Sequence, residues 1–66
     1  MNKFKALDRV RHIKSGNIYR IVTTSKKCKI EATNESAYIY RLDKDPNGTF
    51  WVRPQIEMED GRFELA

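Results

Sequence analysis

The chain has 66 residues, enough for one small domain, which we expect to span residues 3–65. One cysteine excludes an internal disulfide, and one cysteine with one histidine fall short of the ligand sets of structural zinc sites. No run of about 18 apolar residues occurs, so neither a membrane-spanning helix nor a secretory signal is expected. We therefore expect a soluble, cytoplasmic protein with no metal and no cofactor.

Positive charge is concentrated in the N-terminal half. The net charge is +4, but residues 1–29 carry nine basic side chains against one acidic (+8), and residues 30–66 carry four against eight (−4). This split predicts a basic binding face, unless strands from the two halves interleave and neutralise each other. A third arrangement is an acidic C-terminal segment that folds over the basic half and masks it.

The clearest local signal is a hairpin near the N-terminus. Residues 9–14 and 18–24 are rich in β-branched and long side chains, which is typical of strands. Between them lies the turn triplet Ser15-Gly16-Asn17, in which Gly16 or Asn17 adopts a positive φ at low cost. We expect an antiparallel hairpin with a bulge.

Further strands are expected downstream. Residues 28–32 alternate apolar with charged side chains, and residues 37–42 are apolar and aromatic. The turn at residues 43–48 ends in Asn-Gly, whose two residues are expected to be left-handed, and residues 49–53 follow as a strand. Pro54 has no N–H to donate, so this strand should end there or lie at a sheet edge.

The C-terminal part fits a helical turn or an irregular crossing at residues 55–59 and a short closing strand at 62–65. Strands at intervals of about 8–12 residues predict an all-β fold. We expect a small SH3-like barrel or a strongly curled antiparallel sheet of about five strands, because closure removes exposed edges. The predicted core consists of Val10, Ile13, Ile18, Ile21, Ile30, Ile39, Phe50, Val52 and Phe63, with Leu42 and Met58 as contributors.

Two segments resemble a known family. Residues 10–22, Val-Arg-His-Ile-Lys-Ser-Gly-Asn-Ile-Tyr-Arg-Ile-Val, are similar to the opening hairpin of the small bacterial and phage family catalogued as domain of unknown function 1653. Trp51-Val52-Arg53-Pro54, then Met58 and Arg62-Phe63-Glu64, resemble its closing signature, and residues 38–41 its middle strand. Ser15 is an additional residue in the first turn. The resemblance implies an SH3-like fold and a bacterial or prophage setting, and it brings no assigned activity.

No group of residues predicts catalysis. His12 is the only side chain that titrates near neutrality unperturbed, and we expect it to bond a backbone carbonyl or water rather than act as a base. Cys28 lies in an alternating segment, which favours a small core residue over a reactive thiol. Glu57, Glu59 and Asp60 fit a solvated acidic segment better than an acid–base pair. We expect no catalytic residue and no enzymatic activity.

The candidate binding residues are basic or aromatic. Cations hold phosphates and aromatic rings stack unpaired bases, as in nucleic-acid binding, whereas aromatic grooves and sheet edges also bind extended or proline-rich peptides. The structural alternative is that these rings fill the ends of a barrel and the arginine stems cover apolar surface. We expect a small non-enzymatic binding or accessory module that engages a protein partner, with nucleic-acid binding as the alternative. The candidate set is Arg9, Arg11, Lys14, Tyr19, Arg20, Lys26, Lys27, Tyr38, Tyr40 and Trp51.

Overall fold

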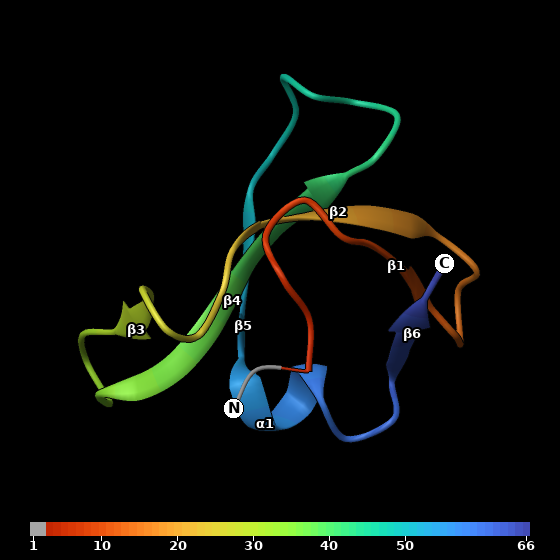
Figure 1. The fold of residues 1–66 in the computed structure, drawn as a ribbon. Coiled ribbons are helices and arrows are strands. Elements are labelled where there is room, and N and C mark those ends of the chain that lie inside the picture. The colour runs from red at the N-terminus through yellow and green to blue at the C-terminus, as the bar shows by residue number, and fades with distance from the viewer. Residues whose placement is uncertain (1–2) are drawn as a thin grey trace.

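The computed structural model describes residues 3–66. Within these residues, six antiparallel strands form one sheet and a single short helix follows the fifth strand (Figure 1). The elements are β1 (Arg9–His12), β2 (Ile18–Thr23), β3 (Lys29–Ile30), β4 (Glu35–Leu42), β5 (Trp51–Pro54), α1 (Gln55–Met58) and β6 (Phe63–Leu65). The expected all-β class is confirmed.

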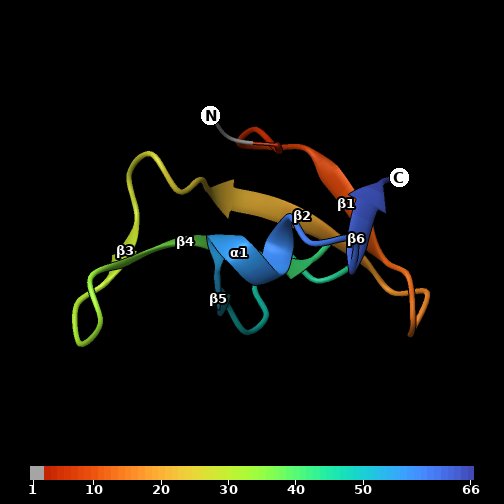
Figure 2. The same ribbon diagram turned by 90° about the horizontal axis from the view of Figure 1, so that it is seen from below.

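β4 is the central strand of the sheet. Along one side, β4 pairs with β3 at its first residues and with β2 further on; along the other side it pairs with β5. β1 and then β6 continue the sheet beyond β2. The sheet does not close, so β5 and β6 lie at open edges, and the short β3, which pairs with β4 alone, is a third edge strand. Of the two predicted forms, the curled sheet is therefore correct and the closed barrel is not. Figure 2 shows the β3 end of the sheet projecting away from the body.

The predicted N-terminal hairpin is confirmed, but β1 and β2 pair in continuous register, without the expected bulge. β1 and β2 pair antiparallel, with Val10 opposite Tyr19. The turn is closed by His12 N–H donating to the Asn17 carbonyl at 2.9 Å and by Gly16 N–H donating to the His12 carbonyl at 2.7 Å. Gly16 takes φ = +76°, the conformation for which a glycine was expected here.

The second predicted glycine turn has a different basis. Among residues 3–66, positive φ is found at Leu7, Asn34, Gly16 and Gly61, so the expected left-handed conformation at residues 47–48 is wrong. Gly48 instead leaves room for Asp45, because a Cβ at residue 48 would overlap the Asp45 carboxylate and force that side chain to move. The turn itself is present, with Gly48 N–H donating to the Asp45 carbonyl at 3.0 Å.

The core lies on one face of the sheet, which we call the inner face. It consists of Phe4, Val10, Ile21, Tyr38, Tyr40, Met58 and Phe63, all at most 5 % exposed, with Tyr19 packed against them. Phe4 comes from the N-terminal segment and Met58 from α1, so these two segments cover the inner face of the strands. Val10, Ile21, Met58 and Phe63 confirm the predicted core.

Other predicted core residues lie elsewhere. Ile13, Leu42, Phe50 and Val52 are 39–56 % exposed, and Ile18, Ile30 and Ile39 are half-buried. For Ile39 and Val52 the physical reason is strand alternation. Because Tyr38 and Tyr40 of β4 point inward, Ile39 and its cross-strand partner Val52 lie on the opposite, outer face.

Across residues 3–66, no helix has both the length and the hydropathy needed to cross a bilayer.

Candidate functional site

Two of the predicted binding aromatics belong to the core. Tyr38 is fully buried and Tyr40 is 5 % exposed. The ring of Tyr40 packs edge-on against Tyr19 at 5.1 Å between centroids, and Phe63 lies 5.7 Å from Tyr40. Half-buried Tyr19 completes this cluster. Tyr38 and Tyr40 are therefore not accessible binding residues: both lie on the inner face of β4, where Phe4 packs against Tyr38 and where Tyr19 and Phe63 pack against Tyr40.

The predicted arginines are engaged in ion pairs. Arg9 Nε lies 3.1 Å from Asp43 Oδ2, and Arg20 Nη2 lies 2.9 Å from Asp43 Oδ1. The hydrogen bond from Arg20, with the neighbouring Arg9, lowers the pKa of Asp43. Arg11 pairs with Glu64 of β6 at 2.7 Å. Acidic side chains from the second half of the chain thus neutralise the arginines of the first, which is the interleaved arrangement.

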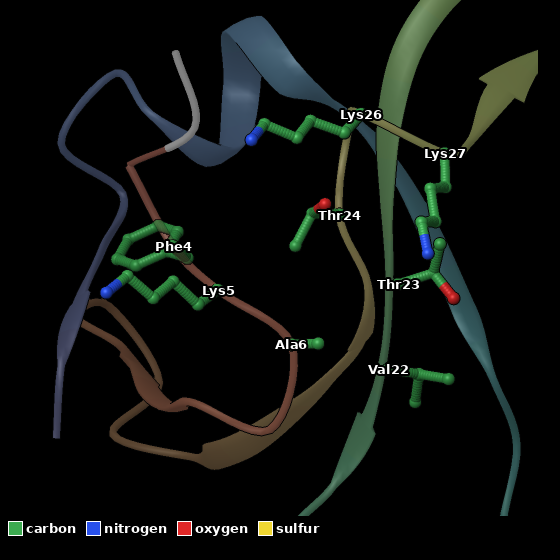
Figure 3. A pocket seen from close by; sticks show the side chains of 8 residues that line it. All are labelled: Phe4, Lys5, Ala6, Val22, Thr23, Thr24, Lys26 and Lys27. Atoms are coloured by element: carbon green, nitrogen blue, oxygen red, sulfur yellow. The ribbon is translucent and has the colours of Figure 1, made fainter.

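The predicted lysines are in a different situation. Within residues 3–66, no lysine forms an ion pair with a carboxylate; every ion pair there uses an arginine. Lys26 and Lys27 follow β2 and line a cavity of about 600 Å³ together with Lys5 (Figure 3). Lys14 is exposed beside the hairpin turn, away from this cavity. The predicted basic residues therefore do not converge on one face.

His12 forms a local contact in the hairpin turn. Its Nδ1 lies 2.8 Å from Ser15 Oγ, and its ring lies 5.0 Å from that of Phe63. The partner is thus a side-chain hydroxyl three residues away, rather than the expected backbone carbonyl or water. Ser15 Oγ also accepts the Asn17 backbone N–H at 3.2 Å, which makes the serine part of the turn.

Side chains bridge the gap between the β5 and β6 edges of the sheet. The Arg53 guanidinium of β5 lies 5.4 Å from the ring centroid of Phe63 in β6. Arg53 Nε donates to the Tyr40 hydroxyl at 3.1 Å, and Arg53 Nη1 and Arg62 Nη1 lie 3.2 and 3.0 Å from Glu57 Oε1. The bonds with Tyr40 and Glu57 raise the pKa of Arg53, despite its partial burial. We call these contacts the Arg53 seam.

Several exposed apolar side chains lie along β5 and at the start of α1. Phe50, Trp51, Val52 and Ile56 are 56, 49, 55 and 77 % exposed, and they account for four of the eight exposed large hydrophobic residues in residues 3–66. We call these four residues the β5 surface. Trp51 lies opposite Tyr40, at the rim of the inner face, whereas Val52 lies on the outer face. A concentration of apolar groups in seven consecutive residues is the pattern of an interaction surface.

A second cavity lies where β5 passes into α1. It has a volume of about 550 Å³, and Pro54 and Ile56 form part of its lining together with Glu35 and Ser36 at the start of β4. The cavity therefore extends the β5 surface beyond the end of the strand.

Hydrogen bonding along β4 fixes the direction of its backbone groups. Ala37 N–H donates to the Cys28 carbonyl at 2.9 Å, so the backbone groups of this odd-numbered residue face the β2 and β3 side. Alternation in an antiparallel sheet then turns the groups of Tyr38 and Tyr40 toward β5.

The same alternation determines which groups of β5 are unpaired. Trp51 and Arg53 lie opposite the two tyrosines and pair with β4. The N–H and C=O of Val52, between them, therefore point away from β4 along the sheet edge, and no hydrogen bond to them is recorded from residues 3–66. Pro54 has the same outward direction, so its missing N–H costs the fold no hydrogen bond.

Comparisons with protein-family models, curated proteins and solved structures gave no match to this chain. The site must therefore be interpreted from its own residues. Sequence reasoning placed Phe50 and Val52 in the core and did not consider Ile56 or Lys5. One signal was available: three consecutive apolar residues, Phe50-Trp51-Val52, cannot all lie on one face of a strand.

Proposed function

We propose that this chain is a small non-enzymatic binding module that engages a protein partner through the β5 surface. The observation that carries the proposal is the exposed Phe50-Trp51-Val52 run beside the outward-facing backbone N–H and C=O of Val52. A sheet edge with free backbone groups and flanking apolar side chains is suited to strand addition. The occupant is an extended segment of another protein, which adds to the sheet next to β5.

The chemistry of that segment follows from the two faces of β5. Its side chains alternate, so those on the outer face contact Phe50 and Val52, and those on the inner side meet the rim at Trp51. Ile56 and the adjoining cavity receive a further apolar side chain beyond the end of the strand. The segment is therefore apolar at alternate positions and extended over about four to six residues.

The cellular setting is part of the same proposal. The resemblance to the family catalogued as domain of unknown function 1653 favours a bacterial or prophage origin, and the single cysteine is compatible with the cytoplasm. Nucleic-acid binding, the alternative, is less favoured because Tyr38 and Tyr40 are buried and three of the predicted arginines are paired with carboxylates.

The test uses the Val52 N–H, which this fold does not need. Peptides selected against the protein from a library of random extended sequences are titrated into ¹⁵N-labelled protein. Val52→Pro removes the outward N–H, and Val52→Thr is the matched control that keeps it and remains β-branched. Binding that is lost in Val52→Pro and kept in Val52→Thr supports strand addition. Equal affinity for both variants, with both folded, would overturn it.

A further inference from the structure

The cavity between the N-terminal segment and the chain after β2 has a cationic rim. It is lined by Phe4, Lys5, Ala6, Val22, Thr23, Thr24, Lys26 and Lys27. Figure 3 shows Ala6 and Thr24 facing the space between the two segments; the Lys26 side chain runs along one end of it, and the Lys5 amine extends past Phe4. Lys27 lies along the other wall, beside Thr23. Small and apolar side chains thus line the space, and three lysines border it.

Within residues 3–66, no carboxylate forms an ion pair with the lysines of this rim. The carboxylates Asp43, Glu57, Asp60 and Glu64 pair with arginines, and no lysine of residues 3–66 forms an ion pair. The acidic residue nearest in sequence to Lys5 is Asp8, whose carboxylate accepts the Lys5 backbone N–H at 2.9 Å. Three like charges around one cavity repel one another, and an anion that enters it relieves that repulsion.

Both walls of the cavity are fixed by backbone hydrogen bonds. Leu7 N–H donates to the Ile21 carbonyl and Ile21 N–H to the Asp8 carbonyl, both at 2.9 Å, which joins the N-terminal segment to β2. Lys27 N–H donates to the Thr24 carbonyl at 3.0 Å and holds the turn that carries the lysines. Phe4, which also lines the cavity, is fully buried, so the cavity exists before a ligand arrives.

We propose that this cavity binds the phosphate group of a small organic phosphate. Lys5 and Lys26 hold the phosphate oxygens, the Thr24 hydroxyl donates a hydrogen bond, and the apolar part of the ligand contacts Ala6 and Val22. A volume of about 600 Å³ is within the range of small-molecule sites. The site goes beyond the proposed function, because none of its residues belongs to the β5 surface.

The experiment is an NMR titration of ¹⁵N-labelled protein with adenosine monophosphate, adenosine and inorganic phosphate in parallel. Amide shifts at Lys5, Ala6, Thr24 and Lys26 that saturate with the monophosphate and are absent with adenosine support the site. Saturation by inorganic phosphate at the same concentration identifies the free ion as the ligand, and weaker binding of phosphate identifies the organic part as a contributor. No shift with either phosphate, or equal shifts with adenosine, would overturn the proposal.

A charge-matched pair of double variants separates a site from general attraction. Lys5→Gln/Lys26→Gln removes two rim charges and is expected to weaken monophosphate binding at least tenfold. Lys14→Gln/Lys44→Gln removes the same charge from exposed positions outside the cavity, and is expected to change the affinity less than twofold. Equal weakening by both pairs would contradict a defined site. So would much tighter, steeply salt-dependent binding of a single-stranded oligonucleotide, which is the behaviour of a nucleic-acid surface.

Discussion

The hydroxyl of buried Tyr38 lies between two segments that cover the inner face, donating a hydrogen bond to Glu59 Oε2 and accepting the Phe4 backbone N–H at 3.3 Å. Glu59 Oε2 also accepts the Lys3 backbone N–H at 3.0 Å. One side chain of the central strand thus ties the N-terminal segment to the residue that follows α1. Because so short a chain has a small core, we expect this polar junction to contribute a substantial part of its stability.

Removing the hydroxyl tests that junction. Tyr38→Phe keeps the ring in the core but leaves the Phe4 N–H without its partner and Glu59 with one hydrogen bond fewer. We expect the free energy of unfolding to fall by about 1–3 kcal/mol, measured by urea denaturation. Tyr19→Phe is the control, since no hydrogen bond of the Tyr19 hydroxyl is recorded within residues 3–66. Equal losses in the two variants would show that the junction contributes nothing specific.

The same junction predicts a loss of stability in acid. Burial raises the pKa of Glu59, but hydrogen bonds from Lys3 N–H, Tyr38 and Gln55 outweigh it and hold the pKa below the ordinary value of 4.5. A lowered pKa in the folded state stabilises the protein above the unfolded pKa, and this contribution is lost as pH falls through the folded value. Thermal unfolding between pH 6 and 3 should therefore show a fall in Tm below about pH 4.5. Glu59→Gln should flatten that fall, and an unchanged profile would contradict the assignment.

The junction also predicts a pH dependence of stability at alkaline pH, through the phenol of Tyr38. Burial, followed by the adjacent Glu59, raises the pKa of Tyr38 from 10.0 to about 12. The folded state favours the protonated phenol of Tyr38. The contribution of this phenol to the free energy of unfolding is therefore complete below pH 10 and is lost as pH rises toward 12. Ultraviolet titration of tyrosinate should show one late step in the native protein, absent in Tyr38→Phe. A wild-type titration with no late step would disprove the shift.

The strands can be predicted from the residues of the turns between them. Which face of the sheet is covered, in contrast, depends on distant parts of the chain. The hairpin around Gly16 follows from a few adjacent residues. Pro54 correctly indicated the end of β5, which lies at a sheet edge. Alternation shows that Tyr38 and Tyr40 share a face of β4, but it does not show which face is covered. That depends on Phe4, which comes from a segment with no strand pattern.

The candidate site was less predictable for the same reason. Arg9 meets Asp43 across 34 positions of sequence, and Arg11 meets Glu64 across 53. These pairs neutralise arginines that, in the sequence, suggested a basic face. Neither periodicity nor composition reveals such long-range pairs. The sequence does not distinguish the surroundings of the lysines from those of the arginines; only the arrangement of the strands does.

The first turn offers a test of backbone conformation. Gly16 has φ = +76° and open space around its Cβ position, so a side chain there meets no clash but adopts a conformation that most residues disfavour. Gly16→Ala is expected to reduce the free energy of unfolding by about 1 kcal/mol. Gly16→Asn is the control and should cost much less, because asparagine tolerates left-handed φ. Urea unfolding of both variants checks this, and equal costs would mean that the strain is not conformational.

The Arg53 seam predicts that the guanidinium of Arg53 helps to hold the β5 and β6 edges of the open sheet together. Arg53 stacks over Phe63, donates to the Tyr40 hydroxyl and shares Glu57 with Arg62, contacts that a lysine ammonium cannot make together. Arg53→Lys should therefore lower the free energy of unfolding by about 1–2 kcal/mol. The control is Arg41→Lys on the same sheet, since within residues 3–66 the Arg41 side chain hydrogen-bonds only to the carbonyl of Leu42. Hydrogen exchange should also rise at β6 in Arg53→Lys, because β6 otherwise pairs with β1 alone. Unchanged exchange at β6 would show that its pairing with β1 suffices to hold this edge.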